Sequence, residues 1–518
     1  MQQYDIVIAG AGPTGLMLAC QLSRFGVNFL ILDKKAGPTT QSRALVVQAR
    51  SMEIYEQMGL SGEVEKEGQP SGGISLYKNG KKAASVFLNT MGEGLSPFPY
   101  VMIYEQSKNE TLLYNHLQSR GDNVLWDSEI TNIKEADNQY VVEIVQATGG
   151  ATSIGCKYLV ACDGSKSIVR EFAGMAFTGG TYENVFYVAD THVKATGIAN
   201  NMLSLFLTKQ AITFFFPLPG PERVRLLGIL PKEYYHHDTI QFDGLISHVK
   251  EVVQMPVEFY DTNWYSTYKL HHKKVEHFNK SNMFFAGDAA HVHSPAGGQG
   301  MNTGLQDAYN LAWKLALVSK GQAGNALLNT YHEERNPIAE RLLKTTDRAF
   351  TIMTNSNAFL GFIKLFVVPR VVPFFNKFKR MRTLWFSEVS QIKISYKKSS
   401  LAKGKAGKIQ AGIRFPYVKI SHKGNVVSVF QLILQYHTKP FLIMLYNVPE
   451  DGFATFDKEL FSILSFEVNA ANNETFKQQG FPSSFVVVLR PDTYVGYVAD
   501  SINVDEIKKF MKECYYLL

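Results

Sequence analysis

Cysteine is scarce in this sequence: there are four in 518 residues, and no two of them form a CxxC pair. Without that pair, and without the cysteine–histidine spacing of a zinc site, thiol redox chemistry and structural zinc are excluded as main functions. His291 and His293 have no nearby carboxylate or cysteine partner, so we expect no metal site. Four unpaired thiols suit a reducing compartment, which predicts a cytoplasmic protein.

Long apolar runs are also missing. The most apolar stretch, residues 359–375, is interrupted by Lys364, Pro369, Arg370 and Pro373, and is too short and too broken to span a bilayer. A strand predicted to start at Tyr4 leaves no room for a signal peptide. We therefore expect no integral membrane segment.

Positive charge is in slight excess, with a formal net charge of +7, but it is unevenly placed. Between Lys364 and Lys408 there are twelve Lys or Arg residues and one acid, Glu388, so the rest of the chain is slightly acidic. A nucleic-acid-binding protein would more often spread its cations over a binding face, so that class is disfavoured. Two interpretations of the basic stretch stay open: a solvated surface segment, or a contact with anionic lipid or an acidic partner.

The remaining composition is that of a folded, multi-domain chain. Apolar residues make up 45% and aromatic residues 12%, which supplies ample core material. At roughly 150 residues per domain, the length predicts about three domains.

The first sixty residues contain a dinucleotide-binding fingerprint. A buried strand is predicted over 4–9, the glycine turn Gly10-Ala-Gly-Pro-Thr-Gly15 follows it, and a helix leads to a second strand that ends at Asp33. Gly10 permits the tight turn, Gly12 lets the backbone approach a pyrophosphate, and Gly15 lets helix and strand pack closely. The helix N-terminus offers N–H groups to phosphates, and Asp33 can bind a ribose hydroxyl. The motif by itself does not distinguish FAD from NAD.

Two later motifs have the same organisation, a buried strand followed by a polar turn. The strand over 158–162 leads into Asp163-Gly-Ser-Lys-Ser-Ile-Val-Arg170, where Ser167 can cap a helix. The strand over 283–286 leads into Gly287-Asp-Ala-Ala-His291 and a glycine-rich loop over 294–302, before a helix predicted from about Thr303 to Lys320. Asp288 can hold a ribose or ribityl hydroxyl, and the helix N-terminus can stabilise negative charge.

In this order the three motifs resemble the flavoprotein aromatic hydroxylases of the para-hydroxybenzoate hydroxylase type. The segment Arg43-Ala-Leu-Val-Val-Gln-Ala-Arg50 and the long C-terminal extension resemble the larger phenol-, polyketide- and antibiotic-modifying members. The resemblance implies an α/β fold: a Rossmann-like FAD-binding domain with an inserted β-sheet substrate domain, plus a C-terminal thioredoxin-like domain. We expect the FAD-binding domain with its helical extension at 1–73, 103–173 and 265–400, the substrate sheet at 74–102 and 174–264, and the thioredoxin-like domain, which lacks CxxC, at 401–518.

The same resemblance assigns residues to the cofactor. It implies that the ADP half of FAD is held by Gly10, Gly12, Gly15 and Asp33. It implies further FAD contacts from Arg43, from Gln106 near the ribityl chain, from Asp163, which also serves transient NAD(P)H binding, and from Asp288 at the ribityl–pyrophosphate region. The flavin ring would be bordered by Pro295, Gly300, Met301 and Asn302. No catalytic base is assigned; the flavin-adjacent candidates are Pro295, Asn302 and Arg43. Asp33 departs from the glutamate that is commoner in this family, and Lys34 and Lys35 after it are interpreted as solvated lysines.

The implied activity is an NADPH- or NADH-consuming, FAD-dependent monooxygenase that uses O2 to hydroxylate a phenolic or polycyclic aromatic molecule, including antibiotics such as rifamycins or tetracyclines, through a C4a-peroxyflavin. Epoxidation and Baeyer–Villiger insertion stay open, as does a homodimer. The rival hypothesis is a flavin-fold binding protein that sequesters an unstable intermediate without oxygenation. A plain NAD dehydrogenase is a weaker rival.

The segment between the later motifs should wall the substrate site. Residues 203–207 and 211–216 are predicted to form a hairpin, with Phe214 and Phe216 on one face and Phe215 on the other. The sequence leaves open which of the two faces is turned toward the active site. Arg223 and Arg225 are expected to be solvated strand residues.

Overall fold

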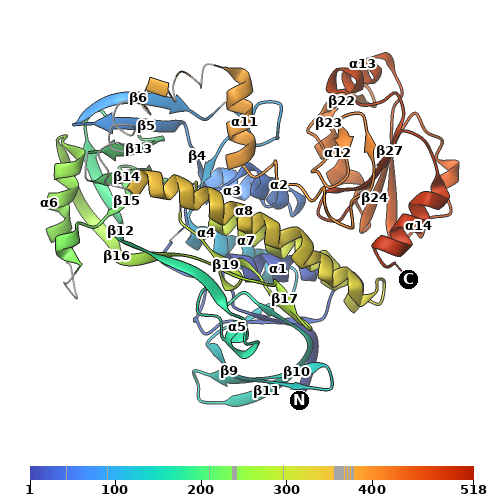
Figure 1. Ribbon diagram of the computed structural model, residues 1–518, viewed down its shortest axis with the longest axis horizontal. Coiled ribbons are helices and arrows are strands. Elements are labelled where there is room, and N and C mark those ends of the chain that lie inside the picture. Colours follow the sequence, from blue (N-terminus) through green and yellow to red (C-terminus); the bar gives the residue numbers. More distant parts are fainter. Residues whose placement is uncertain are drawn as a thin grey trace.

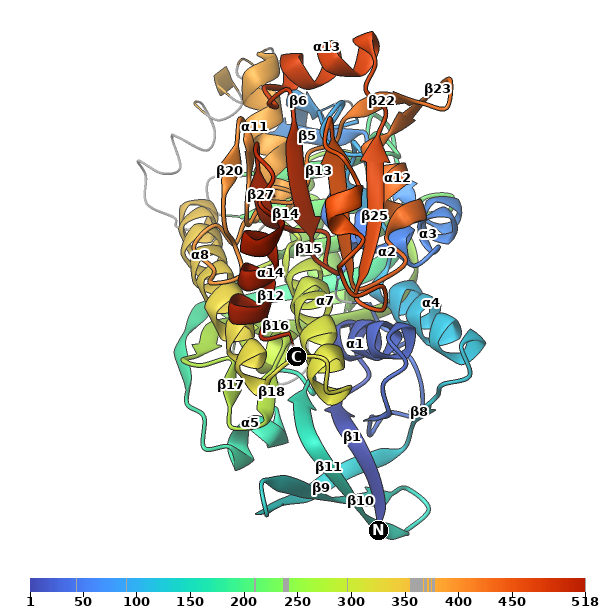
Figure 2. The ribbon, with the colours of Figure 1, turned by 90° about the vertical axis from the view of Figure 1, so that its right-hand side faces the viewer.

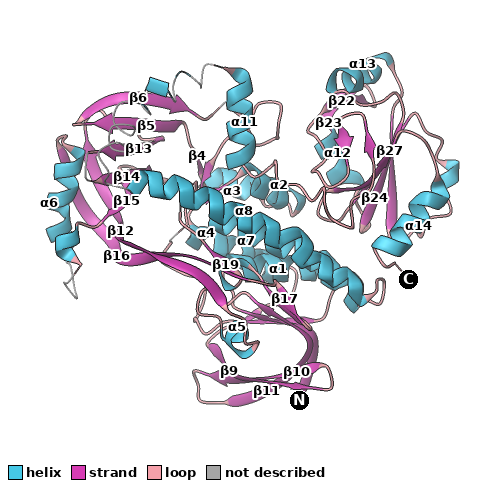
Figure 3. Ribbon diagram, in the orientation of Figure 1, coloured by secondary structure: helices cyan, strands magenta, loops and turns pink. Residues whose placement is uncertain are grey.

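The structure is a computed structural model that describes residues 1–42, 44–89, 91–208, 211–235, 242–295, 297–354, 367, 370–371, 374 and 378–517. It is a mixed α/β molecule in which a mainly parallel sheet, a mainly antiparallel sheet and a C-terminal sheet unit are joined by helices (Figures 1 and 3). No helix in these described ranges is long and apolar enough to cross a bilayer.

The first sheet contains the strands that precede all three motifs. Its order is β17-β18-β11-β1-β2-β8, with β10 and β9 continuing from β11. The pairs β1–β2, β1–β11, β2–β8 and β11–β18 are parallel, so the strands before the motifs end at one edge. The strands are β1 (Gln2–Ala9), β2 (Phe29–Leu32), β8 (Val124–Leu125), β9 (Ser128–Ala136), β10 (Gln139–Gln146), β11 (Ala151–Ala161), β17 (Asn279–Lys280) and β18 (Met283–Phe285).

Helices cover this sheet with apolar side chains. Leu16 to Leu22 of α1 (Pro13–Arg24) are buried, and α1 packs against both α4 (Gln106–Ser119) and α7 (Gly300–Ser319). α7 is buried along almost its whole length, which is the pattern of a helix surrounded by protein. The long α8 (Asn329–Thr354) and α2 (Ala49–Gln57) pack against α7, and α3 (Ser61–Glu67) packs against α2. The short α5 (Ile168–Phe172) packs against β9 and β11. A small sheet is formed by β3 (Val46–Val47), β7 (Met102–Ile103) and β4 (Gln69–Pro70).

The second sheet has the order β19-β16-β12-β15-β14-β13-β5-β6. The predicted hairpin is present, because Leu205 pairs with Phe214 and Ser204 with Phe215. α6 (Phe242–Val253) covers one face. The predicted boundary at residue 264 falls inside β16, which runs on to Val275. The strands are β5 (Gly73–Lys78), β6 (Lys81–Phe87), β12 (Phe177–Ala195), β13 (Met202–Leu207), β14 (Ile212–Pro217), β15 (Arg223–Ile229), β16 (Val257–Val275) and β19 (His291–Val292).

The C-terminal unit has its own sheet, in the order β25-β24-β26-β27, and its own apolar core (Figure 2). β24 (Phe441–Tyr446) is parallel to β25 (Phe461–Phe466) and antiparallel to β26 (Phe485–Leu489), which pairs antiparallel with β27 (Val495–Ala499). The other elements are β20 (Lys405–Ala406), β21 (Ile409–Gln410), β22 (Lys419–His422), β23 (Asn425–Ser428), α12 (Val429–Tyr436), α13 (Ala470–Gln479) and α14 (Val504–Cys514); α11 (Lys379–Val389) precedes the unit.

Buried charges dock this unit against α7 and α8. Arg490 lies 2.9 Å from Glu334 of α8 and 2.6 Å from Asp492, and Lys314 of α7 lies 2.8 Å from the same glutamate. Arg50 of α2 also donates to the Asp492 carbonyl over 2.8 Å. All these side chains are buried, so each charge depends on its partners rather than on water.

Candidate functional site

The glycine turn is packed too tightly for side chains at two of its three glycines. Gly10 has φ +96°, and a Cβ there would lie 2.5 Å from the carbonyl oxygen of Cys162. A Cβ on Gly15 would lie 1.9 Å from the carbonyl oxygen of Gly10. The end of β1, the start of α1 and the end of β11 therefore meet backbone to backbone, as the fingerprint predicts.

Gly12 differs from its neighbours. A Cβ there would meet no atom of the described residues within 4 Å. Gly12 is the N-cap of α1, no side chain in the described ranges caps this helix end, and its first turn contains no acid. An open approach to uncapped N–H groups at the positive end of a helix fits a pyrophosphate.

Asp33 lies against this turn. Its Oδ2 accepts a hydrogen bond from the Ala11 amide over 2.7 Å, and its Oδ1 accepts from the Lys35 amide over 2.9 Å. Lys35 is partly buried, not solvated as predicted, and lies 3.2 Å from the buried Glu110. Lys34 is exposed and lies 3.3 Å from Glu129. Both lysines have acidic partners within the protein.

Gln106 is the first residue of α4. Its Oε1 accepts from the Ala44 amide over 3.2 Å, and its Nε2 donates to Glu110 over 3.0 Å. Ser42 also bonds to this helix end, because its hydroxyl lies 2.8 Å from that of Ser107. Arg43, the predicted FAD-contacting arginine, lies outside the described residues.

The second motif forms a compact turn around Asp163. Its Oδ2 accepts from the Ile168 amide over 2.9 Å, and Ser167 caps α5 by accepting from the Arg170 amide over 3.0 Å. The Asp163 Oδ1 is buried with no hydrogen-bond partner among the described residues, and burial raises the pKa of this carboxyl.

Arg170 joins the second motif to the third. It donates to the carbonyl of Ser165 over 2.7 Å and to that of Ala289 over 3.1 Å, and its guanidinium lies 4.1 Å from the centre of the Phe177 ring. This arginine ends the second sequence motif, which by itself predicts no role for it. It is a structural link between the two turns.

The third motif lies directly beside the first. A Cβ on Gly287 would lie 2.4 Å from the Thr14 hydroxyl of α1, and one on Gly304 of α7 would lie equally close to the same atom. Asp288 follows β18 and is exposed. The fold thus gathers Gly12, Asp163 and Asp288 at the carboxyl edge of one parallel sheet, although more than 270 residues separate the first from the last.

α7 begins at Gly300, not near Thr303 as predicted. Gly300, Met301 and Asn302 therefore form its first turn instead of a loop before it. The Pro295 carbonyl accepts from the Gly298 amide over 3.0 Å, which folds the glycine-rich loop back on itself. Pro295 itself is exposed.

Asn302 was a flavin-adjacent candidate, but its side chain is fully used within the protein. Its Oδ1 accepts from the Gln48 amide over 2.8 Å and from Ser51 over 2.7 Å, while its Nδ2 donates to the carbonyls of Val46 and Gly298. Two acceptances and two donations exhaust an amide. Asn302 thus clamps the loop to the segment after residue 43, which is a positioning role.

A buried charge cluster that sequence reasoning missed supports this region. Asp307 accepts from the Gly287 amide over 3.1 Å, lies 2.8 Å from His291, and pairs with Arg335 over 2.7 Å. The His293 Nε2 lies 3.3 Å from the position that a Cβ on Gly300 would occupy. Burial lowers the pKa of His293 to about 4. No group of three potential metal ligands occurs in the described part of the chain.

The second sheet presents two different faces. Phe215 is buried with Tyr187 and Phe206 on the face that α6 covers. Phe216 packs against the small apolar cluster of Leu45, Ile103 and Leu218, and so does Val46, whose carbonyl accepts from Asn302. The Phe214–Phe216 face is therefore the one turned toward the flavin motifs.

Arg225 lies on the same face as Phe216, which is its register partner. The expectation that it is solvated is wrong, because it is 2% exposed and bonded to the buried Asp190 over 2.6 Å. Trp264 donates to the same carboxylate over 3.1 Å. The Arg225 Nη1 is buried without a hydrogen-bond partner among the described residues. Arg223 is only partly exposed and lies 3.3 Å from Glu105.

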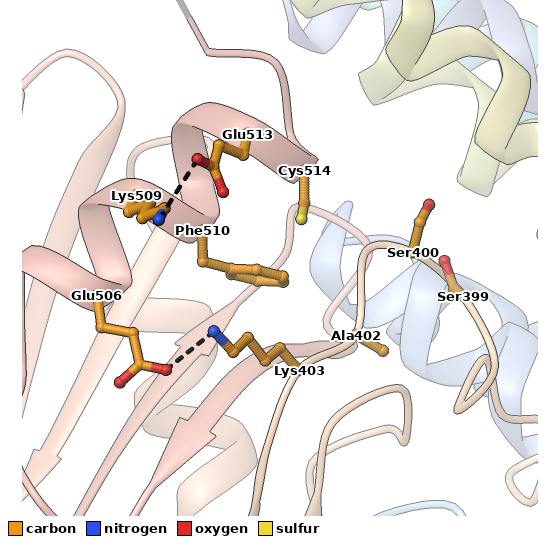
Figure 4. A pocket seen from close by; sticks show the side chains of 9 residues that line it. All are labelled: Ser399, Ser400, Ala402, Lys403, Glu506, Lys509, Phe510, Glu513 and Cys514. Atoms are coloured by element: carbon orange, nitrogen blue, oxygen red, sulfur yellow. Dashed lines mark ion pairs between the residues drawn. The ribbon is translucent and has the colours of Figure 1, made fainter.

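A cavity of about 480 Å³ lies elsewhere, between α14 and residues 399–403 (Figure 4). Its charges already have partners: Lys403 lies 2.9 Å from Glu506, and Lys509 lies 3.8 Å from Glu513. None of the predicted site residues lines it.

Comparison with known proteins agrees with this geometry. Residues 3–346 match the family described as FAD binding domain. The chain is 33% identical over 358 residues to 6-methylpretetramide 4-monooxygenase of Streptomyces rimosus, and 31% identical over 346 residues to pentachlorophenol 4-monooxygenase of Sphingobium chlorophenolicum. These alignments cover 68% and 66% of this chain, but in each case only 63% of the relative.

Among solved structures, the OxyS anhydrotetracycline hydroxylase from Streptomyces rimosus is similar over 99% of both chains, with a TM-score of 0.80 and 24% identity. At this identity the likeness establishes the fold. Because it spans 99% of this chain, it includes the C-terminal unit.

Proposed function

This chain belongs to the FAD binding domain family, and from that premise we propose that it is an NADPH- or NADH-consuming monooxygenase that hydroxylates a phenolic or polycyclic aromatic substrate. The observation that carries the proposal is the convergence of the three motifs on the open backbone at Gly12. The two relatives named above are monooxygenases, one named for a polycyclic pretetramide and the other for a chlorinated phenol. Both substrate types are therefore part of the proposal.

The residues at the carboxyl edge of the first sheet would hold FAD. Gly12 and the first turn of α1 would receive the pyrophosphate, with Gly10 and Gly15 shaping the turn and Asp33 at the ribose. Gln106, Asp163 and Asp288 would serve the remaining polar groups of the cofactor, and Arg43 is retained as a proposed contact. Bound FAD would supply electron transfer from NAD(P)H and the activation of O2.

The N-terminus of α7 would stabilise negative charge on the flavin ring. No side chain among the residues that the structure describes caps this end, and its first turn contains no acid, so the N–H groups of Gly300 and Met301 face no competing carboxylate from that turn. Asn302 holds this turn to the segment after residue 43, and Asp307 ties α7 to the Gly287 amide. Pro295 would border the ring. The chain's own contribution is therefore orientation and a preorganised positive field.

The aromatic substrate would lie between this helix end and the Phe214–Phe216 face of the second sheet. The aromatic side chains supply apolar walls that exclude water. Arg225, held by Asp190 and Trp264, would orient a substrate oxygen through its remaining N–H group, Nη1.

We further propose that the C-terminal unit is a thioredoxin-like domain without redox activity. The order β25-β24-β26-β27, with one parallel and two antiparallel pairs and with α13 and α14 following β25 and β27, supports this interpretation. Cys514 is the only cysteine in the unit, so it cannot form an intramolecular dithiol there. Its proposed role is structural, through the charges around Arg490. The segment boundaries expected from the sequence and a cytoplasmic location are parts of the same proposal.

The test is NADH and NADPH oxidation by the purified yellow protein, followed together with O2 uptake and product mass, across phenols, tetracyclines and rifamycins. A compound that accelerates oxidation and gains one oxygen atom establishes a monooxygenase and its substrate class. A compound that binds tightly but neither accelerates flavin reduction nor gains oxygen supports the rival, a sequestering protein. A colourless protein that cannot be reconstituted with FAD contradicts both.

A further inference from the structure

Exposed apolar side chains are concentrated in one short part of the chain. Of the fourteen large hydrophobic residues exposed in the described ranges, seven fall between residues 367 and 385: Val367, Val371, Phe374, Phe378, Met381, Leu384 and Trp385. Phe374 is 54% and Trp385 43% exposed. Single exposed apolar residues are ordinary, but such a concentration marks an interaction surface.

Helical geometry explains the presentation of these side chains. Met381, Leu384 and Trp385 are spaced i, i+3 and i+4 on α11, so they share one face. Phe386 points the other way and is buried, because its ring occupies the space beside Gly92. α11 is thus anchored by one aromatic residue and turns an apolar face outward, at the upper end of the molecule in Figures 1 and 2.

The same segment is strongly cationic. Residues 364–387 contain six Lys or Arg residues and no acid. Lys379 and Arg380 are exposed at the start of α11, and Arg370 is exposed before it. The first acid, Glu388, pairs with Lys393 and lies 2.7 Å from Arg341. We call the exposed residues Arg370, Val371, Phe374, Phe378, Lys379, Arg380, Met381, Leu384 and Trp385 the α11 surface.

We propose that the α11 surface docks the protein onto an anionic lipid bilayer. Apolar and aromatic side chains flanked by cations are the combination that inserts at the headgroup boundary, where Trp is favoured and Lys and Arg meet lipid phosphates. No helix in the described ranges can cross a bilayer, so the contact is peripheral. Aromatic polycycles concentrate in lipid, and a peripheral site would give access to them there.

A second copy of the chain is a poorer occupant. A two-fold dimer through this face would place the same cations opposite each other, with no acid between residues 364 and 387 to compensate them. An acidic protein would satisfy the charges, but it would not require the row of exposed apolar side chains.

The test uses the FAD-loaded full chain with phosphatidylcholine vesicles, with and without 30% phosphatidylglycerol, at low and at physiological salt. We expect flotation with the anionic vesicles only, weakened by salt, and a blue shift in Trp fluorescence that Trp385→Phe removes. The double variant Lys379→Gln/Arg380→Gln should weaken partitioning by about 30-fold. Leu384→Ser should weaken it by about tenfold.

The matched control is Lys458→Gln/Lys477→Gln, which removes the same charge from exposed lysines of the C-terminal unit and should leave binding unchanged. Equal binding to neutral vesicles, an equal loss in the control, or a wild-type fluorescence shift in Trp385→Phe overturns the proposal. Binding to polyglutamate as strong as to anionic vesicles overturns it in favour of an acidic protein. Lipid-free dimerisation abolished by Leu384→Ser overturns it in favour of a second copy.

Discussion

The glycine turn at residues 10–15 and the docking cluster around Arg490 both bring distant segments together, but by opposite physical means. In the turn, backbone atoms approach until no side chain fits at Gly10 or Gly15, and one position, Gly12, stays open. In the docking cluster, full charges are buried and each is bonded to other protein groups. The turn keeps N–H groups for a ligand, whereas the side chains of Arg490, Glu334 and Lys314 are bonded to one another and to Asp492 inside the protein. The first arrangement suits a binding site and the second a structural interface.

The glycines themselves give the largest test of this contrast. Gly15→Val should abolish folding, because its Cβ would overlap a backbone carbonyl at 1.9 Å that cannot move away cheaply. Gly12→Val should fold with nearly wild-type stability and lose FAD, because its side chain would occupy only the cofactor's space. Circular dichroism and flavin absorbance measure the two effects separately. Full FAD occupancy in Gly12→Val would contradict the placement of the pyrophosphate.

The docking cluster should respond in the reverse way. Glu334→Ala leaves Arg490 and Lys314 buried with one acid fewer, so we expect a loss of about 3–5 kcal/mol in the free energy of unfolding. FAD affinity should change little, because the cluster touches no cofactor residue. The control is Glu333→Ala, an exposed neighbour that bonds to Ser400 and should cost less than about 1 kcal/mol. Denaturant unfolding and FAD titration check both, and equal losses in the two variants would contradict the cluster's role.

Two histidines, His293 near the flavin loop and His437 in the C-terminal unit, extend the comparison to pH. Burial lowers the pKa of His293, near the flavin loop, and of His437, in the C-terminal unit, each to about 4. Between pH 6.5 and 4 the unfolded chain takes up protons that the folded chain does not, so stability should fall as pH falls, by roughly 1–3 kcal/mol for each histidine.

Substituting each histidine in turn distinguishes an effect on FAD binding from an effect on stability alone. His293→Gln should flatten this pH dependence and also the release of FAD in acid, whereas His437→Gln should flatten the stability curve alone. Thermal unfolding and flavin fluorescence across this pH range measure both. If His293→Gln releases FAD in acid as the wild type does, His293 has no influence on the cofactor site.

The smallest expected effect concerns Asp288. Asp288→Ala should weaken FAD binding by about tenfold, or about 1.4 kcal/mol, through loss of a charge-assisted hydrogen bond, while the chain still folds. Isothermal titration of the apoprotein with FAD provides the measurement. If this variant binds FAD with wild-type affinity, Asp288 does not contact the ribityl chain.

Local sequence patterns were enough to predict the strands before the three motifs and the glycine turn. Each motif strand was predictable from its apolar, β-branched run. Gly10, Gly12 and Gly15 could be assigned because a strand–turn–helix constrains its own backbone. The start of α7 was misplaced by three residues, because glycines at 297, 298 and 300 suggest a loop whether or not the chain is helical at Gly300.

Only the tertiary structure decided which polar groups have partners. The Asn302 amide bonds to three residues from a distant segment, Val46, Gln48 and Ser51, and to the nearby Gly298, which the sequence did not indicate. Arg225 was expected to be solvated, but strands β12 and β16 bring Asp190 and Trp264 to it. Which face the Phe214–Phe216 pair occupies was likewise decided by tertiary packing, here of Phe216 against the cluster of Leu45, Ile103 and Leu218. Sequence specifies a cofactor fingerprint because its geometry is local. Burial and pairing depend on residues far away in the chain, so they emerge only when the sheets and helices are assembled.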